Sequence, residues 1–199
     1  MKPVHCGEMM KNNILYGYLV PTLIVFVFLA LIGIAIISLL YRAPIHTADI
    51  MINEIAQLKT ILEKIDRDCK IIDFDYQQNW INFLTIKKDG FVGSEVGTAN
   101  LAYPEKWSGP YVKDNPTIQE KEYMVVRTKD GYFITPGQGV RLPNGKTIGT
   151  DVILDEDADI ISMMRDENAL MYQGKSFAAP LTIGATASRE QVRTILPTE

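Results

Sequence analysis

The sequence predicts an α+β fold in which a long N-terminal helix, apolar in its first half and amphipathic in its second, packs on a small antiparallel sheet. Three observations support this prediction. No residue from Asn12 to Tyr41 is charged, and most of them are large and apolar. An apolar stripe at helical spacing follows, from Met51 to Cys69. Two short runs, EYMVVRT and GYFITP, then flank an Asp-Gly dipeptide, which is typical of a β-hairpin.

The uncharged run is long enough to cross a membrane, because a hydrocarbon core of about 30 Å needs roughly 20 apolar residues in a helix. We expect residues 14–42 to form one transmembrane helix and residues 1–13 to form a short cytoplasmic segment. A cleaved signal peptide is the alternative, but its apolar region is usually only about 7–15 residues long and ends at a small-residue site. Lys2 and Lys11 precede the run and Arg42 follows it, so a slight charge bias favours the N-terminus inside and the rest of the chain outside.

A second, amphipathic helix is predicted over residues 45–69. Its apolar residues recur at steps of four and three: Met51, Ile55, Leu58, Leu62, Ile65 and Cys69. Packing of this stripe against the chain's own domain is the simpler interpretation, and a coiled coil is the alternative. Thr47 is a plausible N-cap. Pro44 is expected to kink or break the helix, unless the axis continues past it as one stem.

The remaining composition argues against several functions. The net charge of −4 gives no sign of nucleic acid binding. Cys6 and Cys69 lie on opposite sides of the predicted membrane segment, so we expect no disulfide between them, and Cys69 reads as a small core residue. The histidines, His5 and His46, belong to no catalytic or zinc-like arrangement. We therefore expect a protein that is not an enzyme.

Residues 70–115 give a mixed signal. The stretch IIDFDYQQNWINFLTI fits either a short helix or a strand, and KKDGFVGSEVGTA has the glycines of a loop. We expect YPEKWSGPYVKDNP to be a structured loop anchored by Trp107 and Tyr111. Beyond the hairpin, Pro143-Asn144-Gly145 predicts a second turn.

An acidic segment, GTDVILDEDADIIS, follows this turn. It holds five carboxylates within nine residues: Asp151, Asp155, Glu156, Asp157 and Asp159. Such a density of like charge must be solvated, placed at a helix start or neutralised by a cation. Calcium takes six to eight oxygen ligands, but the spacing is not that of an EF-hand loop. Residues and spacing alone leave open both a calcium site and a solvated acidic turn.

Several motifs resemble the type IV pilin superfamily, and most closely the major pseudopilin of type II secretion systems. Pro21-Thr22-Leu23-Ile24 resembles the Phe-Thr-Leu-Ile that opens a mature pilin. Trp107-Ser108-Gly109-Pro110-Tyr111-Val112 is similar to the pseudopilin W-x-G-P-Y-L segment, and Tyr123 and then Pro136-Gly137 follow it. Asp157-Ala158-Asp159-Ile160-Ile161-Ser162 resembles the D-A-D-I-x-S ending of a calcium-binding loop after the last strand. These motifs occur in the family's order over residues 21–163.

The resemblance implies a pilin-like globular domain over residues 70–163 and a C-terminal extension over residues 164–199. It implies a subunit of a periplasmic filament, anchored once in the inner membrane and working with like subunits and a secretion or pilus assembly machinery. It also implies calcium as a cofactor. The residues implied as calcium ligands are Asp151, Asp157, Asp159 and Ser162, with Asp155 as a substitute.

Two positions depart from the family pattern and define an alternative. The glycine that a prepilin peptidase recognises is replaced by Val20, and the glutamate that follows the mature start is replaced by Val25. The alternative is a protein with a single membrane span that acts outside the cytoplasm as an accessory or binding protein and does not polymerise. The extension contains FAAPLTIGA, which we expect to form either an extra strand or a partner-binding tail.

Overall fold

The computed structural model describes residues 8–90 and 93–183, with side chains from residue 19 onward apart from Tyr41. Helix α1, Glu8–Cys69, contains Pro21 and Pro44. Two compact units divide at the second proline, one ending at Pro44 and the other beginning at Ile45. The helix is not broken at Pro44, so the prediction of an N-cap at Thr47 is wrong. In a continuous helix the amides of each turn donate to carbonyls four residues earlier, so Thr47 lies inside the helix and not at its start.

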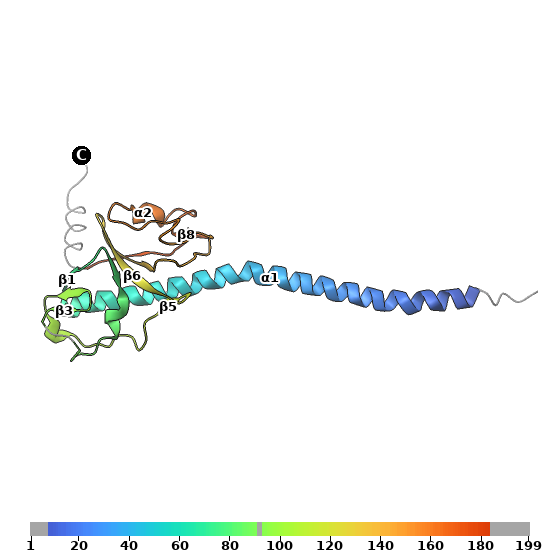
Figure 1. Cartoon of the computed structure of the whole chain (residues 1–199), viewed down its shortest axis with the longest axis horizontal. Helices are drawn as coiled ribbons and strands as arrows, with labels where there is room; N and C mark the ends of the chain where they lie inside the picture. The colour runs from blue at the N-terminus through green and yellow to red at the C-terminus, as the bar shows by residue number, and fades with distance from the viewer. Residues whose placement is uncertain (1–7, 91–92, 184–199) are drawn as a thin grey trace, which may run out of the picture. The chain divides into compact units, whose positions relative to one another are not determined.

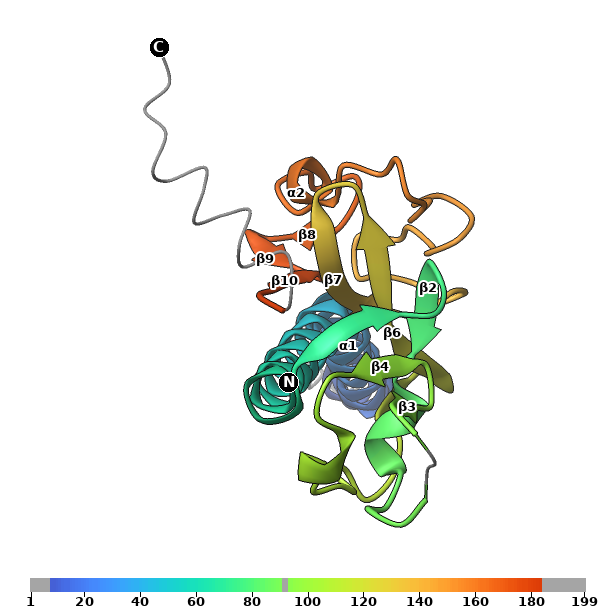
Figure 2. The ribbon, with the colours of Figure 1, turned by 90° about the vertical axis from the view of Figure 1, so that its left-hand side faces the viewer.

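The second unit is built from short antiparallel strands gathered around the C-terminal part of α1 (Figures 1 and 2). A five-stranded sheet has the order β10-β7-β6-β2, with β5 also paired to β6. A three-stranded sheet has the order β1-β4-β3, and β8 and β9 form a separate ribbon. The α+β class is therefore confirmed. The strands are β1 Ile71–Phe74, β2 Gln78–Trp80, β3 Glu95–Val96, β4 Ala99–Leu101, β5 Thr117–Ile118, β6 Lys121–Thr128, β7 Gly131–Pro136, β8 Met171–Tyr172, β9 Lys175–Ser176 and β10 Ala179–Leu181.

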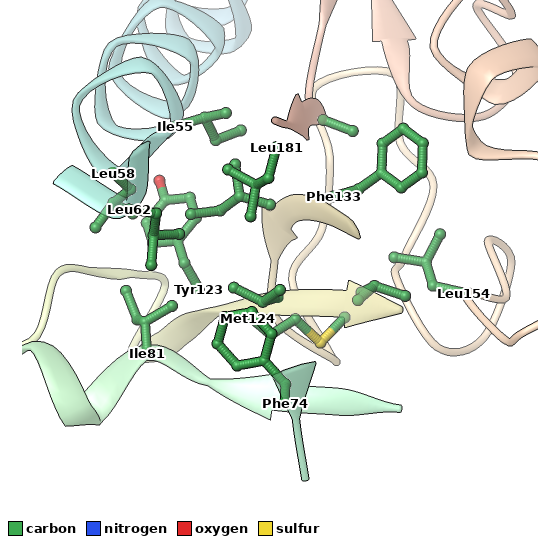
Figure 3. Packing of buried hydrophobic residues seen from close by; sticks show 14 of the residues in the cluster. Ile55, Leu58, Leu62, Phe74, Ile81, Tyr123, Met124, Phe133, Leu154 and Leu181 are labelled. Atoms are coloured by element: carbon green, nitrogen blue, oxygen red, sulfur yellow. The ribbon is translucent and has the colours of Figure 1, made fainter. Parts of the chain in front are cut away.

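The apolar stripe of α1 faces the unit's own core, as predicted. Its members are all at most 3% exposed: Met51, Ile55, Leu58, Leu62, Ile65 and Cys69. In Figure 3, Ile55, Leu58 and Leu62 point toward Tyr123 of β6 and Leu181 of β10. Burial of one such side chain contributes about 1.5–3 kcal/mol, so this face explains why the sheet holds the helix.

The hairpin predicted around Lys129-Asp130-Gly131 is confirmed. Strands β6 and β7 pair from Tyr123↔Pro136 to Thr128↔Gly131. Gly131 lies at the first position of β7 with φ 128°, so it supplies the positive φ just after the two loop residues Lys129 and Asp130. The second turn also forms, because the Gly145 amide donates to the Leu142 carbonyl at 2.9 Å and Gly145 has φ 86°.

The region of mixed signal contains both kinds of structure. Strands β1 and β2 are followed directly by the 3-10 helix η1, Ile81–Thr85. A second 3-10 helix, η2 Pro104–Lys106, opens the loop expected to carry aromatic anchors. In that loop Trp107 is buried, and its ring lies edge-on to Tyr111 with 4.8 Å between centroids. The Trp107 indole N–H also donates to the Ile86 carbonyl at 3.0 Å.

The first part of the C-terminal extension belongs to the same core. A short helix, α2 Ile160–Met163, leads into β8, β9 and β10. Strand β10 pairs antiparallel with β7 from Ala179↔Ile134 to Leu181↔Tyr132, so the extra strand expected in FAAPLTIGA is present. Phe177 and Ile183 are buried beside it. Residues 184–199 and Cys6 lie outside the described residues.

Candidate functional site

The first feature with a functional bearing is the apolar surface of α1 between residues 19 and 40. Its large apolar side chains are about half to three-quarters exposed, from Ile32 at 45% to Phe26 at 75%. Soluble proteins do not present a continuous apolar surface of this extent to water. Within the described part of the chain, one helix is long and apolar enough to cross a membrane. A signal sequence passes the same test of length and composition, so that alternative stays open.

The second feature is the acidic segment, which connects the turn at Asn144 to helix α2. Three further strands follow it, so it does not come after the last strand of the fold. All four candidate aspartates and Ser162 are exposed: Asp151, Asp155, Asp157, Asp159 and Ser162. Apolar residues alternate with them and point inward, because Val152, Leu154, Ala158 and Ile160 are each at most 8% exposed. The segment is therefore pinned to the core by its apolar side chains, while its carboxylates stand in solvent.

Two of the carboxylates close local turns. Asp151 Oδ2 accepts a hydrogen bond from the Thr147 amide at 2.8 Å, and the Asp151 amide donates back to the Thr147 carbonyl at 2.9 Å. Asp155 Oδ1 accepts from the Asp157 amide at 3.2 Å, and the Asp155 carbonyl accepts from the Ala158 amide at 3.2 Å. Such side-chain turns are usual for aspartate.

Asp159 is the N-cap of α2. Its Oδ1 accepts from the Ser162 amide at 2.9 Å, and its Oδ2 accepts from the Ser162 hydroxyl at 2.6 Å. These hydrogen bonds from Ser162 lower the pKa of Asp159, since they favour the charged carboxylate. The structure therefore brings Asp159 and Ser162 together, and their side chains bind each other.

Asp157 forms an ion pair with Lys129, which lies in the β6–β7 turn. The Lys129 amide also donates to the Glu156 carbonyl at 3.1 Å, so the hairpin turn and the acidic segment touch through backbone as well as side chain. The hydrogen bond and the charge of Asp157 raise the pKa of Lys129, which keeps the ammonium protonated throughout the neutral range.

The donor chemistry of the segment suits calcium, because carboxylate and hydroxyl oxygens are the ligands that this ion takes. The positions do not assemble into a cage, however. Among the described residues, no three acidic, histidine or cysteine groups come together in a way that could hold a metal ion. The five candidate residues are spread over three local structures: the Asp151 turn, the turn that Asp155 shares with Asp157, and the Asp159 cap with Ser162. Calcium binding stays a prediction.

Sequence reasoning missed the partners that fix this segment. One partner is Lys129. Another is the Gln78 side-chain amide, whose Nε2 donates to the Leu154 carbonyl at 2.7 Å. Outside the acidic segment, the Asn144 side-chain amide lies at hydrogen-bonding distance from the carbonyls of Glu167, Ala169 and Met171, at 2.9–3.1 Å, which ties the Asn144 turn to the residues after α2. The Asn144 turn was visible in the sequence, but nothing in it indicated which later residues its side chain would contact.

No family model, curated protein or solved structure matches this chain. The fold and the exposed helix therefore define the class of protein: an α+β protein with one N-terminal candidate membrane-spanning helix.

Proposed function

We propose that this chain is a membrane-anchored, pilin-like structural subunit of a secretion or pilus-type filament. One observation supports the proposal most directly. Between residues 19 and 40, helix α1 has no charged side chain and its surface is mostly large apolar residues, and over residues 45–69 one face is buried by the chain's own sheet. A pilin-like subunit needs both properties, since its first half stores the subunit in the membrane and its second half carries the globular unit.

The proposal places the protein in the inner membrane with a single span. The N-terminus lies in the cytoplasm and the globular unit lies in the periplasm or outside the cell. Its partners are the lipid bilayer, like subunits or other pilin-like proteins, and the assembly machinery of a type II secretion or pilus system. The role is mechanical protein transport and assembly rather than catalysis. Calcium in the acidic segment is a separable hypothesis, because neither anchoring nor stem packing depends on it.

The alternative is a single-span accessory or binding protein that does not polymerise. Val20 and Val25 favour it, since these two positions lack the glycine and the glutamate of a cleaved, assembling pilin. The fold of the globular unit is compatible with both functions.

Filament formation tests the proposal. Negative-stain microscopy of native membrane fractions with antibody against the globular unit is expected to show labelled filaments. Cells that lack the chain are the control and should show none. Labelled single particles in membranes, with no filament under any assembly condition, would favour the alternative.

Processing gives a second, independent measurement. Gly17 is the glycine nearest before Val20, so Gly17-Tyr18 is an alternative processing point to Val20-Pro21. Intact mass and N-terminal sequencing of the membrane-extracted protein report whether the residues before Tyr18 or Pro21 have been removed. Removal at either point is the result expected of a pilin-like subunit. A full-length chain that starts at Met1 would argue for the non-polymerising anchor.

A further inference from the structure

We infer that the acidic segment, residues 149–162, is closed by the chain's own groups and needs no metal ion, with Lys129 as its built-in counter-ion. The inference concerns the same segment as the calcium prediction and disagrees with it. It does not depend on whether the protein assembles into filaments.

The first support is how the segment is anchored. Val152, Leu154 and Ile160 are at most 3% exposed, which fixes the backbone at three places between the carboxylates. The Leu154 carbonyl is also held, because it accepts a hydrogen bond from the Gln78 side-chain amide at 2.7 Å. Calcium-binding loops use the ion to hold otherwise unanchored backbone, whereas this backbone is already held by its core contacts.

The second support is that the like charges are dispersed in three different ways. All the carboxylates reach solvent, which screens their repulsion. Asp159 caps the start of α2, where its carboxylate accepts hydrogen bonds from the amide and the hydroxyl of Ser162. Asp157 is neutralised by the Lys129 ammonium. Each of the conditions that makes such a charge density tolerable is therefore met within the chain.

The third support is the position of Lys129. It lies in the two-residue loop of the β6–β7 hairpin, and its amide is fixed to the Glu156 carbonyl at 3.1 Å. The side chain therefore starts from a backbone that already touches the segment, which lowers the entropy cost of forming the ion pair. The Lys129 ammonium pairs with Asp157, which is one of the carboxylates that a calcium ion would need as a ligand.

The experiment measures hydrogen–deuterium exchange of the full-length protein in lipid nanodiscs, with 1 mM calcium or with a chelator. The expected result is the same exchange in residues 149–162 under both conditions. Lys129→Met should speed exchange around residues 155–160 by up to about fivefold, the most that an exposed ion pair accounts for. Lys129→Arg, which keeps the charge, should stay close to the wild type.

The matched control is Lys175→Met, which removes an ion pair to Asp49 at 2.5 Å away from this segment. It should leave exchange in residues 149–162 unchanged. Slower exchange of the wild type in calcium, abolished by Asp159→Ala, would overturn the inference and establish the calcium site. Unchanged exchange in Lys129→Met would overturn the role of Lys129. Neither result bears on filament formation, so failure here and failure of the proposed function are distinguishable.

Discussion

Tyr123 and Glu54 form a polar contact between α1 and β6. The Tyr123 side chain is fully buried, and its phenol donates to a Glu54 carboxylate oxygen. Figure 3 shows the oxygen of this side chain turned toward the helix, among Leu58 and Leu62. Glu54 is half-buried, whereas the phenol of Tyr123 is buried and needs an acceptor, so the pair favours one rotation of the helix against the sheet.

Tyr123→Phe is expected to destabilise the globular unit by about 1–3 kcal/mol, because it removes a hydrogen bond to the charged, half-buried Glu54 carboxylate. Chemical denaturation of the full-length protein in detergent, followed by tryptophan fluorescence, measures the change. Tyr76→Phe is the control, since Tyr76 is 63% exposed, and it should change the free energy of unfolding by less than about 0.5 kcal/mol. Equal effects of the two variants would contradict the role assigned to the pair.

The same contact predicts a pH dependence. Burial, and then the hydrogen bond to Glu54, raise the pKa of Tyr123 well above its ordinary value of 10. The stability that this raised pKa contributes is complete below pH 10 and is lost as the pH rises above it, since the unfolded chain then loses the phenol proton first. The melting temperature of the wild type should therefore fall more steeply above pH 10 than that of Tyr123→Phe. Parallel curves for the two proteins would refute this.

Among the elements, the amphipathic part of α1 is the one whose packing the sequence left with two interpretations. Its stripe is buried within the unit, and on its outer side Lys59 and Glu63 form an i,i+4 ion pair at 3.7 Å. An exposed pair of this kind adds only about 0.3–0.5 kcal/mol. The helix is therefore held by its apolar face.

Leu62→Ala is expected to cost about 2–5 kcal/mol, because Leu62 is completely buried and the cavity would be surrounded by packed side chains. Thermal melting followed by circular dichroism measures the loss. Gln57→Ala, on the exposed side of the same helix, should change little. If Leu62 instead served a coiled coil, Leu62→Ala would change the oligomeric state and leave the melting of the unit largely intact.

The β5–β6 hairpin turns through two residues in an unfavourable backbone conformation. Gln119 has φ 52° and Glu120 has φ 62°, the left-handed region that favours glycine. The Gln119 side chain offsets this cost with two hydrogen bonds to the Arg141 backbone. Its Nε2 donates to the Arg141 carbonyl at 2.8 Å, and its Oε1 accepts from the Arg141 N–H at 2.9 Å. Such turns trade local strain for a fixed position of the neighbouring segment.

Glu120→Gly should stabilise the unit by about 0.5–1 kcal/mol, since it relieves the strain without touching the Gln119 contacts. The reciprocal change is Gly174→Ala in the β8–β9 turn. Gly174 has φ 72°, and an added Cβ meets nothing within 4 Å, so this variant isolates the backbone effect and should destabilise by a similar amount. Melting temperatures that move in the same direction for both variants would contradict the strain argument.

For the whole molecule, the exposed apolar surface between residues 19 and 40 makes lipid the expected surroundings. Ile34 lies in this surface and is 64% exposed, and Ile153 lies in the acidic segment and is 50% exposed. The protein covers the two side chains to a similar extent. A difference in their reactivity toward a water-soluble reagent would therefore report coverage by lipid.

In a Cys6→Ser background, Ile34→Cys should resist a water-soluble maleimide in intact membranes and react once detergent removes the lipid. Ile153→Cys should react in both states, and in intact cells only from the outer side if the globular unit lies there. The native Cys69 is a free thiol, but it is buried and should not react with the maleimide. Equal labelling at positions 34 and 153 in membranes would rule out the span, and a cleaved signal would leave no residue 34 to label.

Much of the fold followed from local patterns. The stripe from Met51 to Cys69 and the β6–β7 hairpin were predictable because periodicity and turn residues act over a few neighbouring residues. Strands β1, β2 and β4 were not, since each has only three or four residues, too few to show a period-two pattern in the sequence. The continuity of α1 past Pro44 was open for a related reason: a proline costs one hydrogen bond, and the flanking turns decide whether the helix tolerates it.

The sequence by itself determined the apolar span, the buried face of the amphipathic helix, the hairpin and the presence of a dense acidic segment. Only the tertiary structure decided what that segment does with its charge. Its partners come from distant positions, as with Gln78 and Leu154, which are 76 residues apart. The ion pair of Asp157 with Lys129 likewise exists only because a hairpin turn is brought against the segment. Long-range contacts depend on how the chain folds back on itself, and no local pattern of residues encodes which side chains will meet.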